Sequence, residues 1–217
     1  MKKTYDTILF DLDGTLLDTL DDLADATNYA LREMGFPERS REEVCSFVGN
    51  GIYRQIGRAV PEGTDEDTLN RTIEIYRARY SEHNCEKTDL YPGIRELLSA
   101  LSEKGFRMAV VSNKYDAAVR DMCKKYLSPW ISTALGENMP ARRKKPAPDS
   151  LFDAMKELGA EKERCIYVGD SDVDLETAKN AGIPCIACAW GFRGREFLLS
   201  HGAETVIDSP EELLLHI

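Results

Sequence analysis

Short apolar runs separated by helix-length segments dominate the second half of the chain. These runs predict strands over residues 108–112, 131–135, 166–169, 185–189 and 205–207. An apolar run of the same kind covers residues 7–10 near the start of the sequence. Because strands that alternate with helices pair in parallel through right-handed crossovers, the pattern predicts an α/β fold built on a parallel sheet.

The interval from residue 17 to residue 87 differs, since it has helical periodicity and no convincing strand. One apolar face repeats at offsets of three and four, and it is formed by Leu20, Leu23, Thr27, Leu31 and Met34. Gly35 ends that helix, and a second helix is expected over residues 65–83. We therefore expect residues 1–16 and 88–217 to form a core domain and residues 17–87 to form an inserted helical domain.

A helix-start signal stands near the end of the sequence. Ser209 precedes Pro210 and two glutamates, which predicts a capping box with proline at the first helical position. The apolar residues that follow are expected to pack back on the sheet.

Two acidic residues, Asp11 and Asp13, follow the apolar run 7–10. Strand side chains alternate with a period of two, so both carboxylates should point the same way while Leu12 turns toward the core. Gly14 permits a sharp turn out of the sheet, at the edge where open α/β sheets bind ligands. Two like charges this close are costly without a cation between them. The alternative is an ordinary strand followed by an Asp-Gly turn, and the rest of the chain decides between the two.

The expected strand 108–112 also ends in polar residues. Ser112 and Asn113 precede an expected helix over residues 116–126. A hydroxyl and backbone N–H groups at such a junction suit a phosphate oxygen, although an N-cap is the commoner role for these residues.

Two later segments add a lysine and more acids. Lys145 stands directly before Pro146, and the prolines at 146 and 148 should hold this stretch extended and fix the approach of the lysine. The alternative is a basic surface loop. Clustered acids, Asp170 among them, follow the apolar run that ends at residue 169 and precede an expected helix over 175–181.

Together these four segments resemble the haloacid dehalogenase-like hydrolase superfamily over nearly the whole chain. The resemblance implies an α/β fold with a Rossmann-like parallel sheet core and an inserted helical cap domain. It implies that Asp11 is the nucleophile, which forms an aspartyl-phosphate, and that Asp13 is the general acid and base. It further implies that Lys145, and not Lys144, holds the nucleophile and the phosphate together.

The resemblance also implies binding residues. The residues expected to bind the phosphoryl group are Gly14, Thr15, Ser112, Asn113 and Lys145, with Gly14 and Asn113 contributing backbone N–H groups and Ser112 counted as catalytic. The residues expected to hold Mg²⁺ are Asp11, the carbonyl of Asp13, Asp170 and Asp174, the last directly or through water.

The chemistry of phosphoryl transfer requires these residue types, independently of the family resemblance. A carboxylate nucleophile is repelled by a phosphate dianion, so Mg²⁺ and a lysine must offset the charge. Mg²⁺ prefers oxygen ligands in octahedral geometry, which two carboxylates and a carbonyl supply. No histidine lies near the four segments, which disfavours zinc.

Composition narrows the class of protein further. The net charge of -10 and a pI near 4.9 argue against nucleic acid as a partner. No apolar run is long enough to span a membrane, and the N-terminal residues enter a strand without a signal-peptide core. Six cysteines at this length predict reduced thiols and a cytoplasmic localisation, and Cys185 and Cys188 are interpreted as buried strand thiols. The expected state is a monomer or a weak homodimer.

Within the superfamily, three short patterns resemble the phosphoglycolate phosphatase group. They are Val48-Gly49-Asn50-Gly51 in the helical interval, Trp190-Gly191-Phe192-Arg193 after an expected strand, and Gly169-Asp170-Ser171-x-x-Asp174. In an isolated bundle the glycine pattern would be a helix–helix turn. In a mobile cap the residues expected to contact substrate are Gly49, Asn50, Gly51 and Arg54.

The same comparison reveals departures from that group. Gly136-Glu137-Asn138 stands where the group commonly has Gly-Gly-Asp, and residues 139–143 are unusually basic. These departures leave the identity of the substrate undecided, but they do not affect the predicted chemistry.

The predicted function is a Mg²⁺-dependent phosphomonoester phosphatase that acts on a small phosphorylated metabolite, with 2-phosphoglycolate as the first candidate. The alternatives are a sugar phosphomutase of the β-phosphoglucomutase type, a pyrophosphatase or a nucleotidase. A non-catalytic phosphometabolite-binding protein is disfavoured, because such a module has no need of Asp13.

Overall fold

The structure is a computed structural model that describes residues 5–138, 140 and 142–217. The chain divides into two compact units. The first comprises Met1–Leu17 and Leu90–Ile217, and the second comprises Asp18–Asp89. Among the described residues, no helix is both long enough and apolar enough to cross a membrane.

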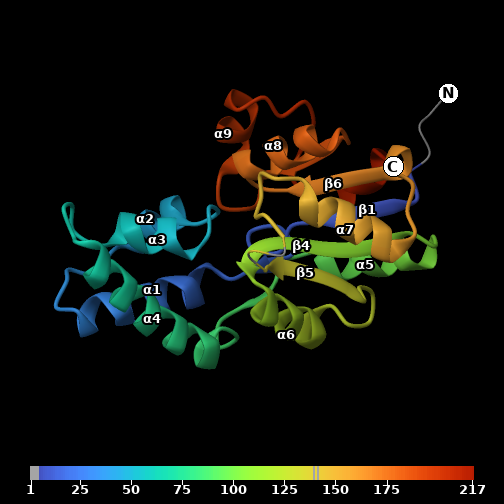
Figure 1. The fold of residues 1–217 in the computed structure, drawn as a ribbon. Coiled ribbons are helices and arrows are strands. Elements are labelled where there is room, and N and C mark those ends of the chain that lie inside the picture. The colour runs from blue at the N-terminus through green and yellow to red at the C-terminus, as the bar shows by residue number, and fades with distance from the viewer. Residues whose placement is uncertain (1–4, 139, 141) are drawn as a thin grey trace. The chain divides into compact units, whose positions relative to one another are not determined.

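A parallel sheet forms the centre of the first unit (Figure 1). Within the described residues its six strands are β1 (Thr7–Phe10), β4 (Arg107–Tyr115), β5 (Thr133–Glu137), β6 (Cys165–Gly169), β7 (Cys185–Cys188) and β8 (Val206–Ile207). Their order is β5-β4-β1-β6-β7-β8, and each neighbouring pair is parallel. The predicted α/β fold is therefore confirmed.

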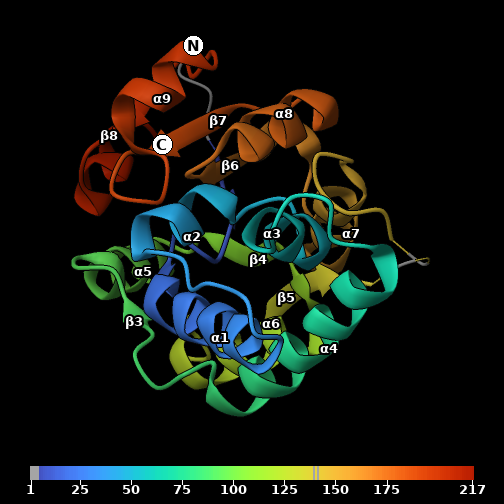
Figure 2. The same ribbon diagram turned by 90° about the vertical axis from the view of Figure 1, so that its left-hand side faces the viewer.

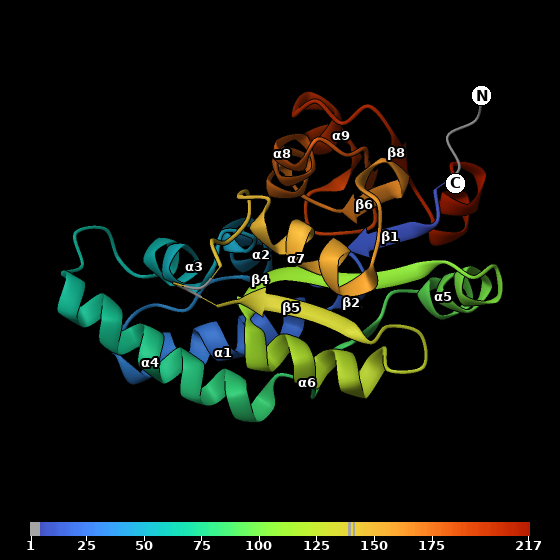
Figure 3. The same ribbon diagram turned by 45° about the vertical axis from the view of Figure 1, so that its right-hand side comes forward.

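Helices cover both faces of this sheet. Figures 1 and 3 show α5 (Ile94–Glu103) and α6 (Asp116–Tyr126) on one face, and α7 (Asp149–Leu158) and α8 (Asp172–Ala181) on the other. The buried cluster between α7, α8 and the sheet includes Leu9 and Tyr167. All four residues of β1 are buried, because a parallel strand covered on both faces has no solvent side. This burial explains why β1 and β6 are continuous apolar runs.

Three further short helices belong to the described part of this unit. They are the short helix η1 (Lys162–Arg164), α9 (Gly194–Ser200), which contacts β7 and β8, and η2 (Pro210–Leu215). The helix η2 is a 3₁₀ helix, and the Ser209 side chain accepts no hydrogen bond from the backbone N–H groups of this helix. The hydroxyl of Ser209 instead donates to the Glu212 carboxylate at 3.2 Å. The predicted capping box is therefore wrong, although proline does stand at the start of the helix.

The structure also corrects the position of Ser112. The sequence predicts a strand that ends at Ser112, whereas β4 continues to Tyr115, with a register shift between Val111 and Tyr115. Ser112 and Asn113 therefore lie within this irregular part of the strand. The N-cap of α6 is Tyr115, so the helix-capping alternative for Ser112 and Asn113 is excluded.

The second unit is helical, as its periodicity predicts. It contains α1 (Leu20–Glu33), α2 (Arg41–Phe47), α3 (Ile52–Ala59) and α4 (Glu66–His83), and Figure 2 shows α1 and α4 side by side. Asp65 caps α4 by accepting the Thr68 N–H at 3.0 Å. Two short strands missed by the sequence analysis, β2 (Leu17–Asp18) and β3 (Asp89–Leu90), pair where the chain passes between the units.

Candidate active site

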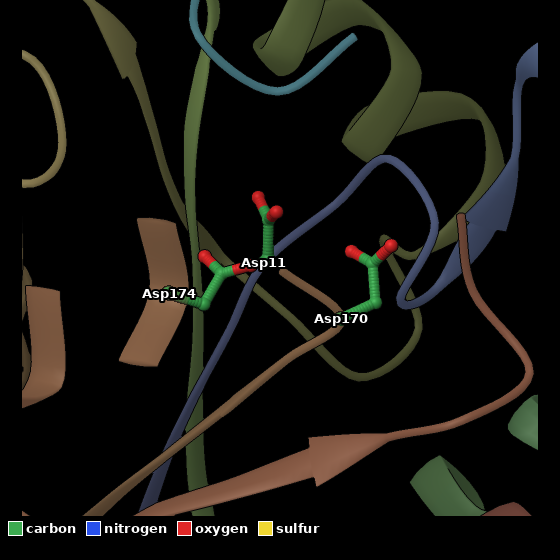
Figure 4. A group of neighbouring side chains, drawn as sticks. All are labelled: Asp11, Asp170 and Asp174. Atoms are coloured by element: carbon green, nitrogen blue, oxygen red, sulfur yellow. The ribbon is translucent and has the colours of Figure 1, made fainter. Parts of the chain in front are cut away.

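Three buried carboxylates meet at the carboxyl edge of the sheet. Asp11 follows β1, Asp170 follows β6, and Asp174 lies in the first turn of α8. Each offers an oxygen within 4.8 Å of the others, and Figure 4 shows the three side chains grouped in one space. In the strand order, the chain from β1 leads to β4 on one side, and the chain from β6 leads to β7 on the other. Such a switch point is where open α/β sheets bind their ligands.

The turn after β1 has the geometry that the sequence predicts. Leu12 is fully buried, and its N–H donates to the Asp11 carboxylate at 2.7 Å. Gly14 has a φ of 82°, and a Cβ there would lie 2.4 Å from an oxygen of Asp170. Glycine is therefore needed for both the backbone conformation and the close approach. The Gly14 N–H donates to the Leu17 carbonyl at 3.0 Å, so in this arrangement it is not available to a phosphoryl oxygen.

Lys145 connects two of the three acids. Its ammonium lies 2.9 Å from Asp11 Oδ1 and 2.7 Å from Asp174 Oδ1, and its side chain is only 3% exposed. Asn113 holds the backbone of this lysine in both directions. Its amide group donates to the Lys145 carbonyl at 3.0 Å, and its carbonyl oxygen accepts the Lys145 N–H at 2.7 Å. Lys145, the lysine before Pro146, is thus brought to the carboxylates by a neighbouring strand.

Asp174 is held from both sides. Its Oδ1 accepts from Lys145 and, at 2.9 Å, from the hydroxyl of Tyr167. Its Oδ2 accepts from the Ser171 N–H at 3.1 Å and from the Ser171 hydroxyl at 2.5 Å. Ser171 and Asp174 form a capping box at the start of α8, so the same bonds begin the helix and orient the carboxylate.

The charges of this group do not balance. Burial raises the pKa of Asp11 well above its ordinary value, the charge of Asp174 raises it further, and Lys145 opposes both. Burial and Asp174 likewise raise the pKa of Asp170 to about 7. Burial by itself would lower the pKa of Lys145, but Asp11 and Asp174 outweigh it and raise that pKa.

The excess of negative charge bears on whether these residues could bind a metal ion. Among the described residues, Lys145 is the one cation that directly bonds members of a triad of acids, so negative charge is in excess. A divalent cation would relieve the repulsion that raises the carboxylate pKa values. The triad offers oxygen donors alone, which suit Mg²⁺. The residues present therefore fit the ion.

Two contacts at the candidate site were not foreseen from the sequence. Lys114 lies 2.8 Å from Asp13 Oδ1, and its side chain is 8% exposed. Tyr167 accepts from Lys145 at 2.9 Å through its buried hydroxyl. Lys114 directly follows Ser112-Asn113, which was a usable signal, whereas nothing separates Tyr167 from other core residues of an apolar strand.

Ser112 and Thr15 also lie at this edge of the sheet. The Ser112 hydroxyl accepts the Lys114 N–H at 3.1 Å, and Ser112 itself is buried. The Thr15 hydroxyl donates to Asp170 Oδ1 at 3.2 Å, so this threonine orients a carboxylate.

The basic stretch before Lys145 is engaged in local ion pairs. Arg142 bonds Asp153 at 2.7 Å and the Gly136 carbonyl at 3.2 Å. Arg143 pairs with Asp149 at 2.9 Å. These guanidinium groups thus hold the loop to α7, which is a structural account of the unusual charge. Residues 139 and 141 of the same stretch lie outside the described residues.

The residues expected to contact substrate from the helical interval belong to the second unit. Gly49 and Gly51 have φ values of 113° and 82°, and Gly51 is the N-cap of α3. Arg54 is exposed on α3. All the other predicted site residues belong to the first unit.

Comparison with known proteins decides the family. The model of the haloacid dehalogenase-like hydrolases matches residues 8–188, which include β1 from its second residue, the strands from β2 to β7 and all three acids of the triad. The chain belongs to this family. The resemblance expected from the four sequence segments is confirmed, and so is the expectation that the protein is an enzyme.

Relatives of this haloacid dehalogenase-like hydrolase are named as phosphoglycolate phosphatases. One from Pseudomonas syringae pv. tomato is 36% identical over 95% of this chain and 78% of its own length. One from Vibrio parahaemolyticus is 34% identical over 95% of this chain and 93% of its own length. A crystal structure from Lactobacillus delbrueckii subsp. bulgaricus, named by inference as a phosphoglycolate phosphatase, matches with a TM-score of 0.92, at 35% identity over 97% of each chain.

Proposed function

We propose that this hydrolase is a Mg²⁺-dependent phosphomonoester phosphatase that acts through an aspartyl-phosphate on a small phosphorylated metabolite. The observation that carries the proposal is the ammonium of Lys145, fixed 2.9 Å from Asp11 within a group of three buried acids. A cation in this position favours the ionised form of Asp11 against the burial that raises its pKa, and it offsets the charge of an approaching phosphate.

Each residue has a defined part in this reaction. A carboxylate oxygen of Asp11 attacks phosphorus, and the bond from phosphorus to the leaving oxygen breaks. Asp13 gives its proton to that oxygen, then takes a proton from the water that hydrolyses the acyl phosphate. Lys114, 2.8 Å from Asp13, orients this acid and base.

Mg²⁺ would be held by carboxylate oxygens of Asp11 and Asp170 and by the Asp13 carbonyl, with Asp174 in support. When bound, it would neutralise negative charge on the transferring phosphoryl group. Ser112 and Asn113 are proposed to bind phosphoryl oxygens. In the structure Asn113 also fixes Lys145, so its substitution should disturb both functions.

For the substrate we propose 2-phosphoglycolate. The support comes from the names of relatives that match over 95% of the chain at 34–36% identity. We further propose that residues 17–87 act as a cap domain, with Gly49, Asn50, Gly51 and Arg54 contacting the non-phosphate part of the substrate. The cytoplasmic localisation and the monomeric or weakly dimeric state stay predictions.

The decisive experiment measures phosphate release from 2-phosphoglycolate, pyrophosphate, nucleotides and sugar phosphates, with Mg²⁺ or with EDTA. We expect Mg²⁺-dependent turnover that is greatest on 2-phosphoglycolate and absent in Asp11→Asn. Lys145→Met should lose activity by at least about a hundredfold, since a buried charged partner is removed. Lys144→Met is the matched control and should keep it.

The outcomes separate mechanism from substrate. Turnover that peaks on another phosphate ester would keep the mechanism and discard 2-phosphoglycolate. Equal losses in Lys144→Met and Lys145→Met would contradict the assigned role of Lys145. Without release from any compound, bisphosphate-primed isomerisation of a sugar phosphate would indicate a mutase in place of a phosphatase.

A further inference from the structure

The segment Trp190–Phe192 follows β7 in sequence and contacts the acidic group from the far end of the chain. The Trp190 indole N–H donates to the Thr15 carbonyl at 3.0 Å. The Phe192 backbone N–H donates to Asp170 Oδ2 at 2.7 Å. The segment therefore binds both the turn after β1 and the carboxylate after β6.

Gly191 lets the backbone come this close. A Cβ at Gly191 would lie 2.3 Å from the Cβ of Asp170 and 2.3 Å from the Gly14 carbonyl oxygen. Gly191 is not among the glycines with a positive φ, so its backbone conformation does not itself require glycine. The space beside Asp170 is the reason that a side chain is excluded here.

Asp170 is consequently enclosed by fixed partners. Its Oδ1 accepts from the Thr15 hydroxyl and its Oδ2 accepts from the Phe192 N–H. Glycines lie against it on two sides, since a Cβ at Gly14 would also meet its carboxylate. A carboxylate has about four acceptor positions, so two bonds leave acceptor positions on the group for a cation. The direction of these positions is set by the partners.

We propose that Trp190, Gly191 and Phe192 form a positioning element, the Asp170 clamp, which sets the affinity of the site for a divalent cation. The proposal rests on the cation site of the proposed function and deepens it. Donors that orient a metal-binding carboxylate typically change metal affinity by about 10–100-fold when they are removed. The Phe192 donor is backbone, so it is positioned through its neighbours Trp190 and Gly191.

The test is a direct titration of the metal-free protein with Mn²⁺, followed by the loss of the electron paramagnetic resonance signal of free Mn²⁺. Mn²⁺ takes the same oxygen donors as Mg²⁺. We expect one Mn²⁺ bound by the wild type, displaced by Mg²⁺ and lost in Asp170→Asn. Trp190→Phe, which removes the indole N–H and keeps an aromatic ring, should weaken Mn²⁺ binding about tenfold. Gly191→Ala should weaken it further, because the new methyl group displaces Asp170.

Trp130→Phe is the matched control. Trp130 is also half-buried, and its indole N–H donates to the Ser99 hydroxyl at 3.2 Å. This substitution removes one indole N–H bond of the same kind and should leave Mn²⁺ binding unchanged. Thermal unfolding of the metal-free proteins separates a loss of affinity from a loss of fold. If Gly191→Ala does not fold, the pair Trp190→Phe and Trp130→Phe decides.

Each outcome bears on a different claim. Wild-type affinity in Trp190→Phe, with binding lost in Asp170→Asn, would overturn the clamp and leave the cation site intact. Equal weakening in Trp190→Phe and Trp130→Phe would also overturn the clamp, because the effect would then be general. No Mn²⁺ binding by the wild type would overturn the cation site and the clamp together.

Discussion

Among individual residues, Lys145 has an ammonium group whose N–H donors are all used in bonds to its neighbours. An ammonium has three N–H donors, and that of Lys145 has three acceptors, namely Asp11, Asp174 and the hydroxyl of Tyr167. The Tyr167 hydroxyl is itself shared, because it also donates to Asp174 at 2.9 Å. A closed set of bonds of this kind fixes the position of the cation beside Asp11 more firmly than any one pair could.

Tyr167→Phe tests this arrangement, since it removes one oxygen and keeps the ring in the core. We expect kcat to fall about tenfold or more, because bonds to charged groups contribute about 1.5–3 kcal/mol. KM for the substrate should change less than kcat if the hydroxyl positions Lys145. Steady-state kinetics with Mg²⁺ at saturation measures both.

Tyr29→Phe is the control for loss of a hydroxyl elsewhere, on α1 of the helical unit. It should keep kcat, and circular dichroism should show both variants folded. An unchanged kcat in Tyr167→Phe would show that Asp11 and Asp174 suffice to hold the lysine.

Among the helices, the start of α8 has both a structural role, which is helix capping, and a role in orienting a carboxylate of the candidate site. Ser171 caps the helix and also donates to Asp174, the acid that bonds Lys145. The capping box of α2, formed by Ser40 and Glu43, has the same geometry in the helical unit and contains none of the predicted site residues. A comparison of the two capping boxes therefore distinguishes the effect of helix capping from the effect of orienting a site residue.

Ser171→Ala and Ser40→Ala make that comparison. Loss of a serine N-cap costs about 1 kcal/mol, so each variant should melt about 2–4 °C below the wild type. Only Ser171→Ala should also lose activity, because Asp174 loses a donor that orients it. Calorimetry and phosphate release measure the two effects. If Ser171→Ala loses stability and keeps full activity, its hydroxyl has no role beyond the helix cap.

Across the whole molecule, the chain enters the helical unit once and leaves it once. Asp22 binds the segment through which the chain leaves that unit. This buried carboxylate on α1 accepts the backbone N–H groups of Lys87 and Thr88 and the Thr88 hydroxyl, at 2.7–3.2 Å. Residues 65 positions apart are thereby joined beside the short strands β2 and β3. By contrast, Asp25 on the same helix pairs with the Lys87 ammonium in solvent.

Asp22→Ala should therefore destabilise the helical unit by about 2 kcal/mol or more, because several buried donors lose their acceptor. Hydrogen exchange should rise along α1 and α4 and around residues 84–90. Asp25→Ala removes an exposed ion pair worth about 0–1 kcal/mol and should leave exchange near the wild-type level. Similar exchange in the two variants would contradict a special role for Asp22.

Local patterns were enough to predict the elements that depend on burial. β1 and β6 are buried along their whole lengths, and the apolar runs predicted both. The helices α1 and α4 follow the predicted periodicity, because one face of each is buried. Ser112 was misplaced because a register shift is a property of paired strands, and a single run of residues does not encode it.

Patterns within the sequence predicted the parallel α/β fold and assigned Asp11 and Asp170 to strand ends, and the family resemblance indicated Lys145 in place of Lys144. These follow from alternation, from glycine and proline geometry and from a family pattern, all of which are local in the chain. The hydrogen-bond partners of these groups depend on the folded arrangement of the strands. Thr15 reaches Asp170 across 155 positions and Trp190 reaches Thr15 across 175, and such bonds exist only once the sheet brings the strand ends together.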